Sequence, residues 1–274
     1  MCLCRVVAAD LLNKKQLANI GSTIGLVTGM APMLAPIIGG YVEETVGWQG
    51  SFVVYALMTS LSLLLFIQYY SESITRFTNE QSIIRRYMVI FRQKQFILFA
   101  LLQGVVLSVL NCFAVVAPFL VQEEMGFSPV FFGWLSGYCA VCQLVSKMTA
   151  PMFIRRLGTF KIQSIGWGVL FLSGLTLTLR YLFIPENTDI FILSIGLAFF
   201  SIHLIIPYLF SEVMSLSASG KGILGAGFSS TGMLFSFVLS SMIAIIPYEG
   251  SGLLGGYYLL LASAGIVFSK FVSL

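Results

Sequence analysis

Long apolar stretches alternate with short polar ones along the whole of this chain. Eight stretches are long enough to cross a lipid bilayer, which takes about 20 mainly apolar residues per helix. They span residues 20–42, 51–70, 96–121, 130–153, 162–183, 190–212, 223–246 and 253–273. A ninth, residues 1–9, is too short to cross. The stretches lack the period-two alternation of a membrane β-barrel strand, so the pattern predicts an all-α protein with eight full transmembrane helices.

The composition agrees with this prediction. Hydrophobic residues make up 58% of the chain and charged residues only 9%, against about 25% charged residues in soluble domains. So little charge cannot cover a surface that faces water on all sides. We therefore expect a protein that crosses the bilayer several times.

The charged residues predict which side each loop faces. Basic residues gather in 10–19, 71–95, 154–161, 213–222 and the C-terminal end, whereas the intervening loops are acidic, with Arg180 at a helix end nearby. Because basic residues accumulate in cytoplasmic loops, we expect the first group and the C-terminus to be cytoplasmic. The net charge of +4 then reports topology and gives no indication of nucleic-acid binding.

The most charged connection, residues 71–95, divides the chain unequally. Two full helices precede it and six follow. We predict that 1–70 is the remnant of an N-terminal helix bundle, that 71–95 is a cytoplasmic linker and that 96–274 is a complete six-helix bundle.

Small residues and prolines form a stripe on the first long apolar stretch. At 100° per residue, they fall within a sector of about 80°. Glycines spaced by four residues let helices approach closely in a bilayer, and a neighbouring helix can cover the carbonyl groups that proline leaves unpaired. The stripe therefore predicts a helix–helix contact. Its members are Gly21, Gly25, Gly29, Pro32, Pro36 and Gly39.

Three sequence motifs resemble one group of transporters. M-A-P-M-L-A-P-I-I-G-G (30–40) followed by G-W-Q-G-S-F (47–52) looks like the fifth-helix antiporter signature of drug exporters of the major facilitator superfamily, within the Bcr/CflA (bicyclomycin-resistance) group. A-P-F-L-V-Q-E-E-M-G-F-S-P-V-F-F-G-W (117–134) resembles the end of that group's seventh helix and the loop after it. C-R-V-V-A-A-D-L (4–11) resembles the end of its fourth helix.

The resemblance implies an architecture and a role for the stripe. In that group the fifth-helix signature lies at the contact between two six-helix halves, which is the implied role of Pro32, Pro36, Gly39 and Gly40. Gly25 and Gly29 continue the same stripe. Ala35 stands where the broader signature has glycine, a small departure. The first three and a half helices would lie upstream of Met1, so the resemblance implies an N-terminally incomplete bundle.

The loop I-R-R-L-G-T-F-K (154–161) resembles the loop between the eighth and ninth helices of the superfamily. Arg155 stands where the better-preserved copy of this motif has an acid, so a gating lock that uses an acid is not supported. We interpret Arg155, Arg156 and Gly158 as a basic cytoplasmic loop.

Five polar residues inside the apolar stretches are candidates for lining a cavity. Such residues are costly in lipid and are functional hypotheses by default. Other interpretations stay open. Gln103 and Asn111 could tie helices together by hydrogen bonds, and the side chain of Lys147 could extend to the membrane surface. His203 could be a proton carrier or a structural residue. The candidates are Gln103, Asn111, Gln143, Lys147 and His203.

The residue inventory argues against an enzyme. His203 is the only histidine, a zinc ligand set is missing, and the apolar stretches have no Asp or Glu in their central parts. We expect neither a metal nor a cofactor. Cys139 and Cys142 form a C-x-x-C that we read as helix packing.

The expected function is proton-coupled export of drugs or small organic molecules by a monomer in the bacterial inner membrane, through alternating access. The carboxylates that such exporters commonly use would lie upstream of Met1. Two alternatives remain open: a truncated remnant that does not transport, and an exporter of a metabolite or siderophore.

Overall fold

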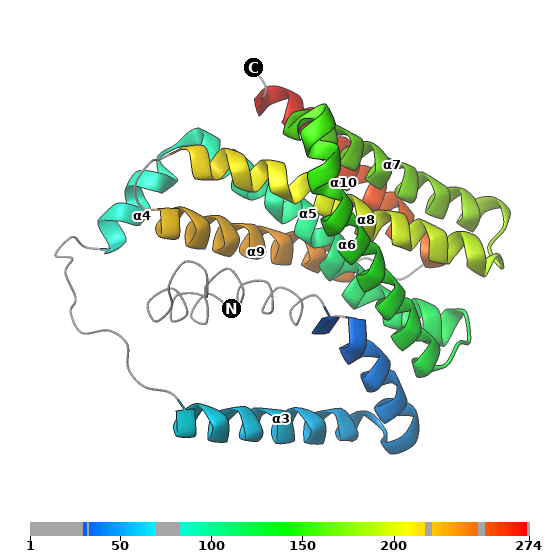
Figure 1. The fold of residues 1–274 in the computed structure, drawn as a ribbon. Helices are drawn as coiled ribbons and strands as arrows, with labels where there is room; N and C mark the ends of the chain where they lie inside the picture. Colours follow the sequence, from blue (N-terminus) through cyan, green and yellow to red (C-terminus); the bar gives the residue numbers. More distant parts are fainter. Residues whose placement is uncertain (1–29, 32, 70–82, 217–220, 246–249, 273–274) are drawn as a thin grey trace. The chain divides into compact units, whose positions relative to one another are not determined.

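The structure is a computed structural model that describes residues 30–31, 33–69, 83–216, 221–245 and 250–272. Every regular element in these ranges is a helix, which confirms the all-α prediction (Figure 1). A helical segment over 33–46 precedes the labelled elements. These are α3 (Trp48–Tyr69), α4 (Ile83–Phe91), α5 (Lys94–Phe119), η1 (Leu120–Glu124), α6 (Pro129–Leu157), α7 (Thr159–Phe183), α8 (Thr188–Ser215), α9 (Lys221–Ile245) and α10 (Gly250–Val272).

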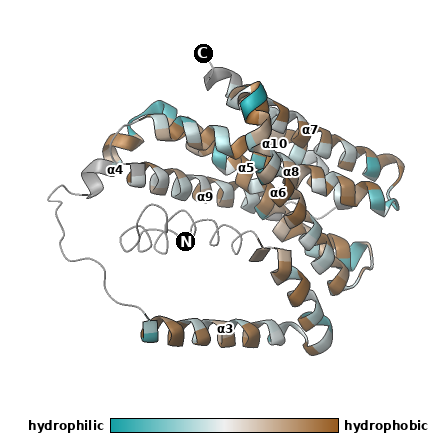
Figure 2. Cartoon of the chain, in the orientation of Figure 1, coloured by the Kyte–Doolittle hydropathy of each residue, from teal (hydrophilic) through white to brown (hydrophobic). Residues whose placement is uncertain are grey.

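Seven described helices are long and apolar enough to cross a membrane. They correspond to seven of the eight predicted spans, so the prediction of a polytopic membrane protein is confirmed. The eighth predicted span, 20–42, begins outside the described residues. Figure 2 shows hydrophobic residues along most of each helix and hydrophilic ones gathered towards helix ends.

A tight turn joins segment 33–46 to α3. Gly47 has a φ of 85°, a value that residues with a side chain rarely adopt, and its N–H donates to the carbonyl of Glu43 at 3.0 Å. Gly50 is the buried residue of α3, because Val42 and Val46 occupy the place where a Cβ would stand. The two glycines of G-W-Q-G therefore let the chain reverse sharply between two helices.

The chain divides into two compact units. One comprises residues 1–80 and 128–140, the other residues 81–127 and 141–274, and α6 contributes to both. The predicted boundaries at residues 70 and 95 stay a prediction. In the second unit, α5 packs against α8, α9 and α10, and α7 packs against α8 and α10.

Large side chains fill the core of the second unit. Trp167 of α7, Phe191 of α8 and Tyr258 of α10 are fully buried. The Tyr258 hydroxyl donates to the carbonyl of Val109 on α5 at 3.3 Å, so α10 is fixed to α5 by a polar contact as well as by packing.

Candidate functional site

Segment 33–46 and the first half of α6 meet in the first unit through glycines. A Cβ built on Gly40 would lie 2.7 Å from the carbonyl oxygen of Pro129, and one on Gly133 would lie 2.6 Å from that of Pro36. One on Gly137 would lie 2.9 Å from the Ile37 side chain. Each helix thus uses glycine where the other presents its backbone, which is how helices approach closely in a bilayer. We call this arrangement the glycine contact.

The glycine contact includes only part of the predicted stripe: Pro36 takes part, whereas a Cβ on Gly39 would have open space around it. Gly40, which only the resemblance assigned to this contact, also takes part. Gly25, Gly29 and Pro32 lie outside the described residues. Gly133 and Gly137 were not predicted, although their G-x-x-x-G spacing is a recognisable packing signal.

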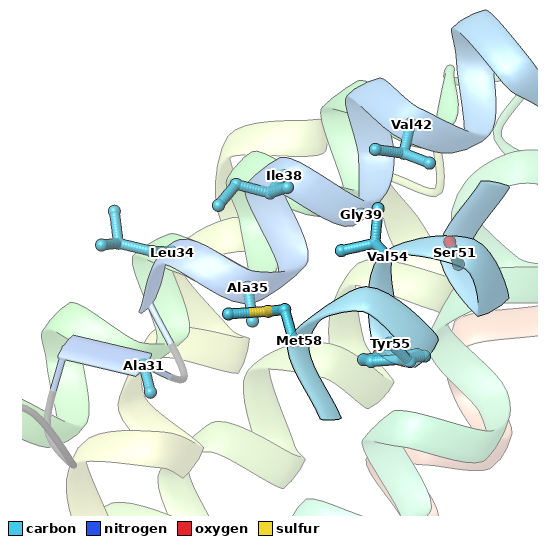
Figure 3. A pocket seen from close by; sticks show the side chains of 10 residues that line it. All are labelled: Ala31, Leu34, Ala35, Ile38, Gly39, Val42, Ser51, Val54, Tyr55 and Met58. Carbon is cyan, nitrogen blue, oxygen red and sulfur yellow. The ribbon is translucent and has the colours of Figure 1, made fainter. Parts of the chain in front are cut away.

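Gly39 borders an apolar hollow of about 300 Å³ between segment 31–42 and α3 (Figure 3). Its wall is formed by Ala31, Leu34, Ala35, Ile38, Gly39, Val42, Ser51, Val54, Tyr55 and Met58. A larger side chain at position 39 therefore has room, which the neighbouring Gly40 does not offer.

Gln103 and Asn111 both contact α9. The Asn111 amide donates to the Ser236 hydroxyl at 2.7 Å. The Gln103 side chain packs against Gly232, and its buried Oε1 has no hydrogen-bond partner. Because Gly232 and Ser236 are one turn apart, the two polar residues of α5 follow one line of contact with α9. The hydrogen bond of Asn111 agrees with the interpretation that this residue ties two helices together, which was the alternative to lining a cavity.

Lys147 and His203 come together at a second hollow, of about 360 Å³, which we call the basic hollow. It lies between α6 and α8, over a buried cluster of Ala150, Ile162 and Leu204. Its wall is formed by Lys147, Ala150, Pro151, Ile154, Arg155, His203, Ile206 and Pro207. Three of the predicted residues thus share one site, although Arg155 was assigned to the loop motif.

The other two predicted polar positions of α6 lie outside this wall. Gln143 is half-buried one turn before Lys147, and Arg156 is exposed in the last turn of α6. Gly158 follows with a φ of 83° and links α6 to α7.

Two prolines change the backbone of the basic hollow. Pro151 follows Lys147 by four residues, and Pro207 follows His203 by four residues. In a regular α-helix, the N–H at these positions would donate to the carbonyl oxygens of Lys147 and His203. Because proline has no N–H, both carbonyl oxygens lose their usual helical donor. In addition, Nδ1 of His203 is buried without a partner. Although Lys147, Arg155 and His203 all border the basic hollow, its surface is almost entirely apolar, and Nδ1 of His203 is buried away from it.

Arg180 is a site residue that sequence reasoning noted only as a base at a helix end. Its side chain is 4% exposed, Nε donates to the carbonyl of Asn187 at 2.8 Å, and Nη1 donates to the Ser251 hydroxyl at 2.7 Å. The Phe191 ring lies 5.2 Å from its Cζ. Arg180 thus joins the ends of α7, α8 and α10. In the sequence, the feature that could have singled out Arg180 is that it is an isolated arginine beside acidic loops.

A third hollow, of about 380 Å³, opens beside Arg180. Its wall includes Glu124, Glu186 and Ser251. This end of the second unit thus brings two carboxylates and one buried guanidinium to the same surface depression.

Comparison with known families places these features in context. The family model of the Major Facilitator Superfamily matches residues 1–195. A bicyclomycin resistance protein homolog from Haemophilus influenzae is 27% identical over 195 residues, which are 70% of this chain and 48% of that protein. The multidrug resistance protein MdtL of Salmonella heidelberg is 26% identical over 259 residues, 88% of this chain and 60% of that protein. The chain thus spans about half the length of the curated relatives it matches.

Solved structures show the same fold. A bacterial homologue of the iron transporter ferroportin in its inward-facing state matches with a TM-score of 0.73 and 20% identity, covering 97% of this chain and 66% of that one. The nucleoside transporter NupG (D323A mutant) matches with a TM-score of 0.62 and 14% identity, covering 99% and 79%.

Proposed function

We propose a transport function from one premise: the chain belongs to the Major Facilitator Superfamily. Its family and relatives are transporters and not enzymes. The proposal is export of drugs or other small organic molecules, coupled to protons, across the inner membrane of a bacterium. The names of the bicyclomycin and multidrug resistance relatives support the drug class, and the distribution of basic loops supports a cytoplasmic C-terminus and this orientation.

The observation that carries the mechanism is the glycine contact. Alternating access requires helices that tilt against one another around a site near the middle of the membrane. Large interlocking side chains resist such movement, because a packed interior must break many contacts to shift. Gly40, Gly133 and Gly137 instead meet backbone atoms and one side chain. We therefore propose that segment 33–46 and α6 tilt here during transport, as the resemblance implies for the contact between the two bundles.

Adjacent glycines provide a matched test. Gly40→Leu places a side chain where a Cβ would already lie 2.7 Å from the Pro129 carbonyl, so it forces the two helices apart. Gly39→Leu makes the same chemical change on the same helix, but its side chain enters the apolar hollow of Figure 3.

The assay measures ethidium and bicyclomycin export from bacteria that lack their own exporters and express this chain with a C-terminal tag. We expect export by the unmodified chain, loss of export with Gly40→Leu and retained export with Gly39→Leu, at equal amounts in the membrane. A protonophore should abolish export. If both leucine variants export equally well, the glycine contact is not the moving contact. If the unmodified chain reaches the membrane and exports neither compound, the alternative of a non-transporting remnant is favoured.

A further inference from the structure

We propose that α4 is a binding surface for anionic phospholipids. It is a helix of nine residues, Ile83–Phe91, in a part of the chain to which the transport proposal gives no role. The position of this helix, the exposure of its apolar residues and its charge all point to the headgroup region of a lipid bilayer, whatever the protein exports.

α4 lies where two membrane-spanning helices begin. It ends at Phe91, and the span of α5 begins at Lys94. It also packs against α9 (Figure 1), where an edge carbon of the Tyr87 ring lies 3.5 Å from the place of a Cβ on Gly227, near the start of that helix. With a length of about 14 Å, α4 is too short to cross a bilayer. We therefore place it at the membrane surface.

The residues of α4 and the arginine after it divide by helical position into three sides. At 100° per residue, the first two sides each occupy a sector of about 60° and the third a sector of about 120°. The first side packs on the bundle, since Ile90 is 9% exposed and Tyr87 is half-buried. The second, which we call the open side, is apolar, yet Met88 is 52% and Phe91 41% exposed. The three sides are Ile83, Tyr87 and Ile90; Ile84, Met88 and Phe91; and Arg85, Arg86, Val89 and Arg92.

The third side is basic. The stretch 83–94 contains four basic residues and no Asp or Glu. The N–H of Arg92 donates to the carbonyl of Met88 at 3.2 Å, so Arg92 continues the helical turn next to the open side. The side chains of Arg92 and Lys94 are exposed. An exposed apolar side next to a basic one is typical of a helix that lies in the headgroup region and turns its apolar side towards the acyl chains.

These features favour lipids with a negatively charged headgroup. Each basic residue near a membrane surface favours anionic lipid by about fivefold, and a guanidinium group can bond two oxygens of one phosphate. Met88 and Phe91 would meanwhile contact the acyl chains. A competing explanation is that the basic residues only set the orientation of the chain in the membrane. In that case α4 would contact neutral and anionic lipids alike.

Bromine-labelled lipids distinguish the two explanations. Met88→Trp places a tryptophan on the open side, and bromine on an acyl chain quenches the fluorescence of a tryptophan that it contacts. The purified full chain is reconstituted in vesicles of equal parts phosphatidylglycerol and phosphatidylcholine, with bromine on the first lipid in one preparation and on the second in the other. The unmodified chain supplies the signal of the three native tryptophans, which is subtracted. We expect phosphatidylglycerol to contact position 88 at least about fivefold more often than phosphatidylcholine.

Two arginine pairs provide matched variants, and each pair follows an isoleucine in the sequence. Arg85→Gln combined with Arg86→Gln removes two positive charges from α4 and should remove most of the preference. Arg155→Gln combined with Arg156→Gln removes the same charge from the last turn of α6, where both side chains are exposed, and should change nothing. Arg85→Lys combined with Arg86→Lys keeps the charge and should keep the preference. Equal elution of all variants on size exclusion controls for folding.

Three results would overturn the proposal. Equal quenching by the two brominated lipids would show that α4 contacts lipid without selecting a headgroup. Quenching by neither lipid would show that protein covers the open side. Equal effects of the two glutamine pairs would show that the total charge of the protein, and not α4, attracts the anionic lipid. Because the measurement uses neither a gradient nor an exported compound, its result is independent of the export assay.

Discussion

Gly255 and Gly256 are neighbours on α10, yet only one of them faces α7. A Cβ on Gly255 would lie 2.6 Å from Oγ1 of Thr178 and 2.8 Å from the backbone nitrogen of Thr178. A Cβ on Gly256 would meet nothing within 4 Å. The contact is reciprocal, because a Cβ on Gly174 of α7 would lie 2.9 Å from the carbonyl oxygen of Gly255. We predict that Gly255→Ala destabilises the protein and that Gly256→Ala does not.

The magnitude follows from two opposing terms. Replacing glycine by alanine inside a helix favours the helix by about 0.8–1.0 kcal/mol in water, and this gain is shared by both positions. Forcing an extra methyl group into a packed contact costs about 1–3 kcal/mol, and this cost applies to Gly255 alone. The helix term cancels in the comparison, so the free energies of unfolding of the two variants should differ by about 1–3 kcal/mol.

The assay is reversible unfolding in mixed micelles of detergent and sodium dodecyl sulfate. Tryptophan fluorescence is a suitable signal, because Trp167 is buried against Gly265 in the same contact of α7 with α10. Gly174→Ala should resemble Gly255→Ala. Combining the two should cost less than their sum, since one separation of the helices relieves both clashes. Equal stability of Gly255→Ala and Gly256→Ala, or lower stability of the latter, would refute the packing that the structure assigns to this contact.

Two further predictions concern polar contacts. Arg180→Lys keeps the charge but cannot reproduce the two directed hydrogen bonds to the Asn187 carbonyl and the Ser251 hydroxyl, so we expect a loss of about 2 kcal/mol in the same unfolding assay; a loss below about 0.5 kcal/mol would contradict the bonding described here. A double-mutant cycle with Asn111→Ala and Ser236→Ala should give a coupling energy of about 0.6 kcal/mol, the average for hydrogen bonds between membrane helices, and no more than about 1.7 kcal/mol, whereas additive effects would show that this bond does not form.

The helices were predictable because the bilayer imposes their length and composition. The apolar stretch 96–121 corresponds to α5, Lys94–Phe119, and 253–273 corresponds to α10, Gly250–Val272. The boundaries differ by a few residues, since helices extend past the apolar stretch wherever the flanking residues also favour a helix. Lys94 is such a flanking residue.

The partners of each helix were less predictable, because hydropathy says nothing about which faces meet. The stripe predicted a contact for Pro36 and Gly39 alike, but the structure turns Gly40 and not Gly39 towards α6. Helical spacing places residues on a common face within a wide sector, and a neighbouring helix covers only part of it. Gly133 and Gly137 carry a packing signal that becomes specific only when its partner helix is known.

The sequence also did not indicate which charged side chains are buried. Arg180 and Arg156 both stand in the last turns of apolar helices, yet Arg180 is 4% exposed and Arg156 is exposed. The difference arises from residues distant in the chain, since the Ser251 hydroxyl accepts a bond from Arg180. The position of a charge along one helix does not disclose such a partner.

Two of the glycine-lined contacts among the described residues differ in what reinforces them. Between α7 and α10, Gly174 and Gly255 bring the backbones together, and Arg180 then bonds to Ser251 near the start of α10. A buried charged hydrogen bond is expensive to break, so these helices should move as one body. In the glycine contact, Gly40 and Gly133 each meet the backbone carbonyl oxygen of a proline. Close approach of two backbones through glycine leaves few side chains to interlock, and this is why we propose movement at the glycine contact and rigidity between α7 and α10.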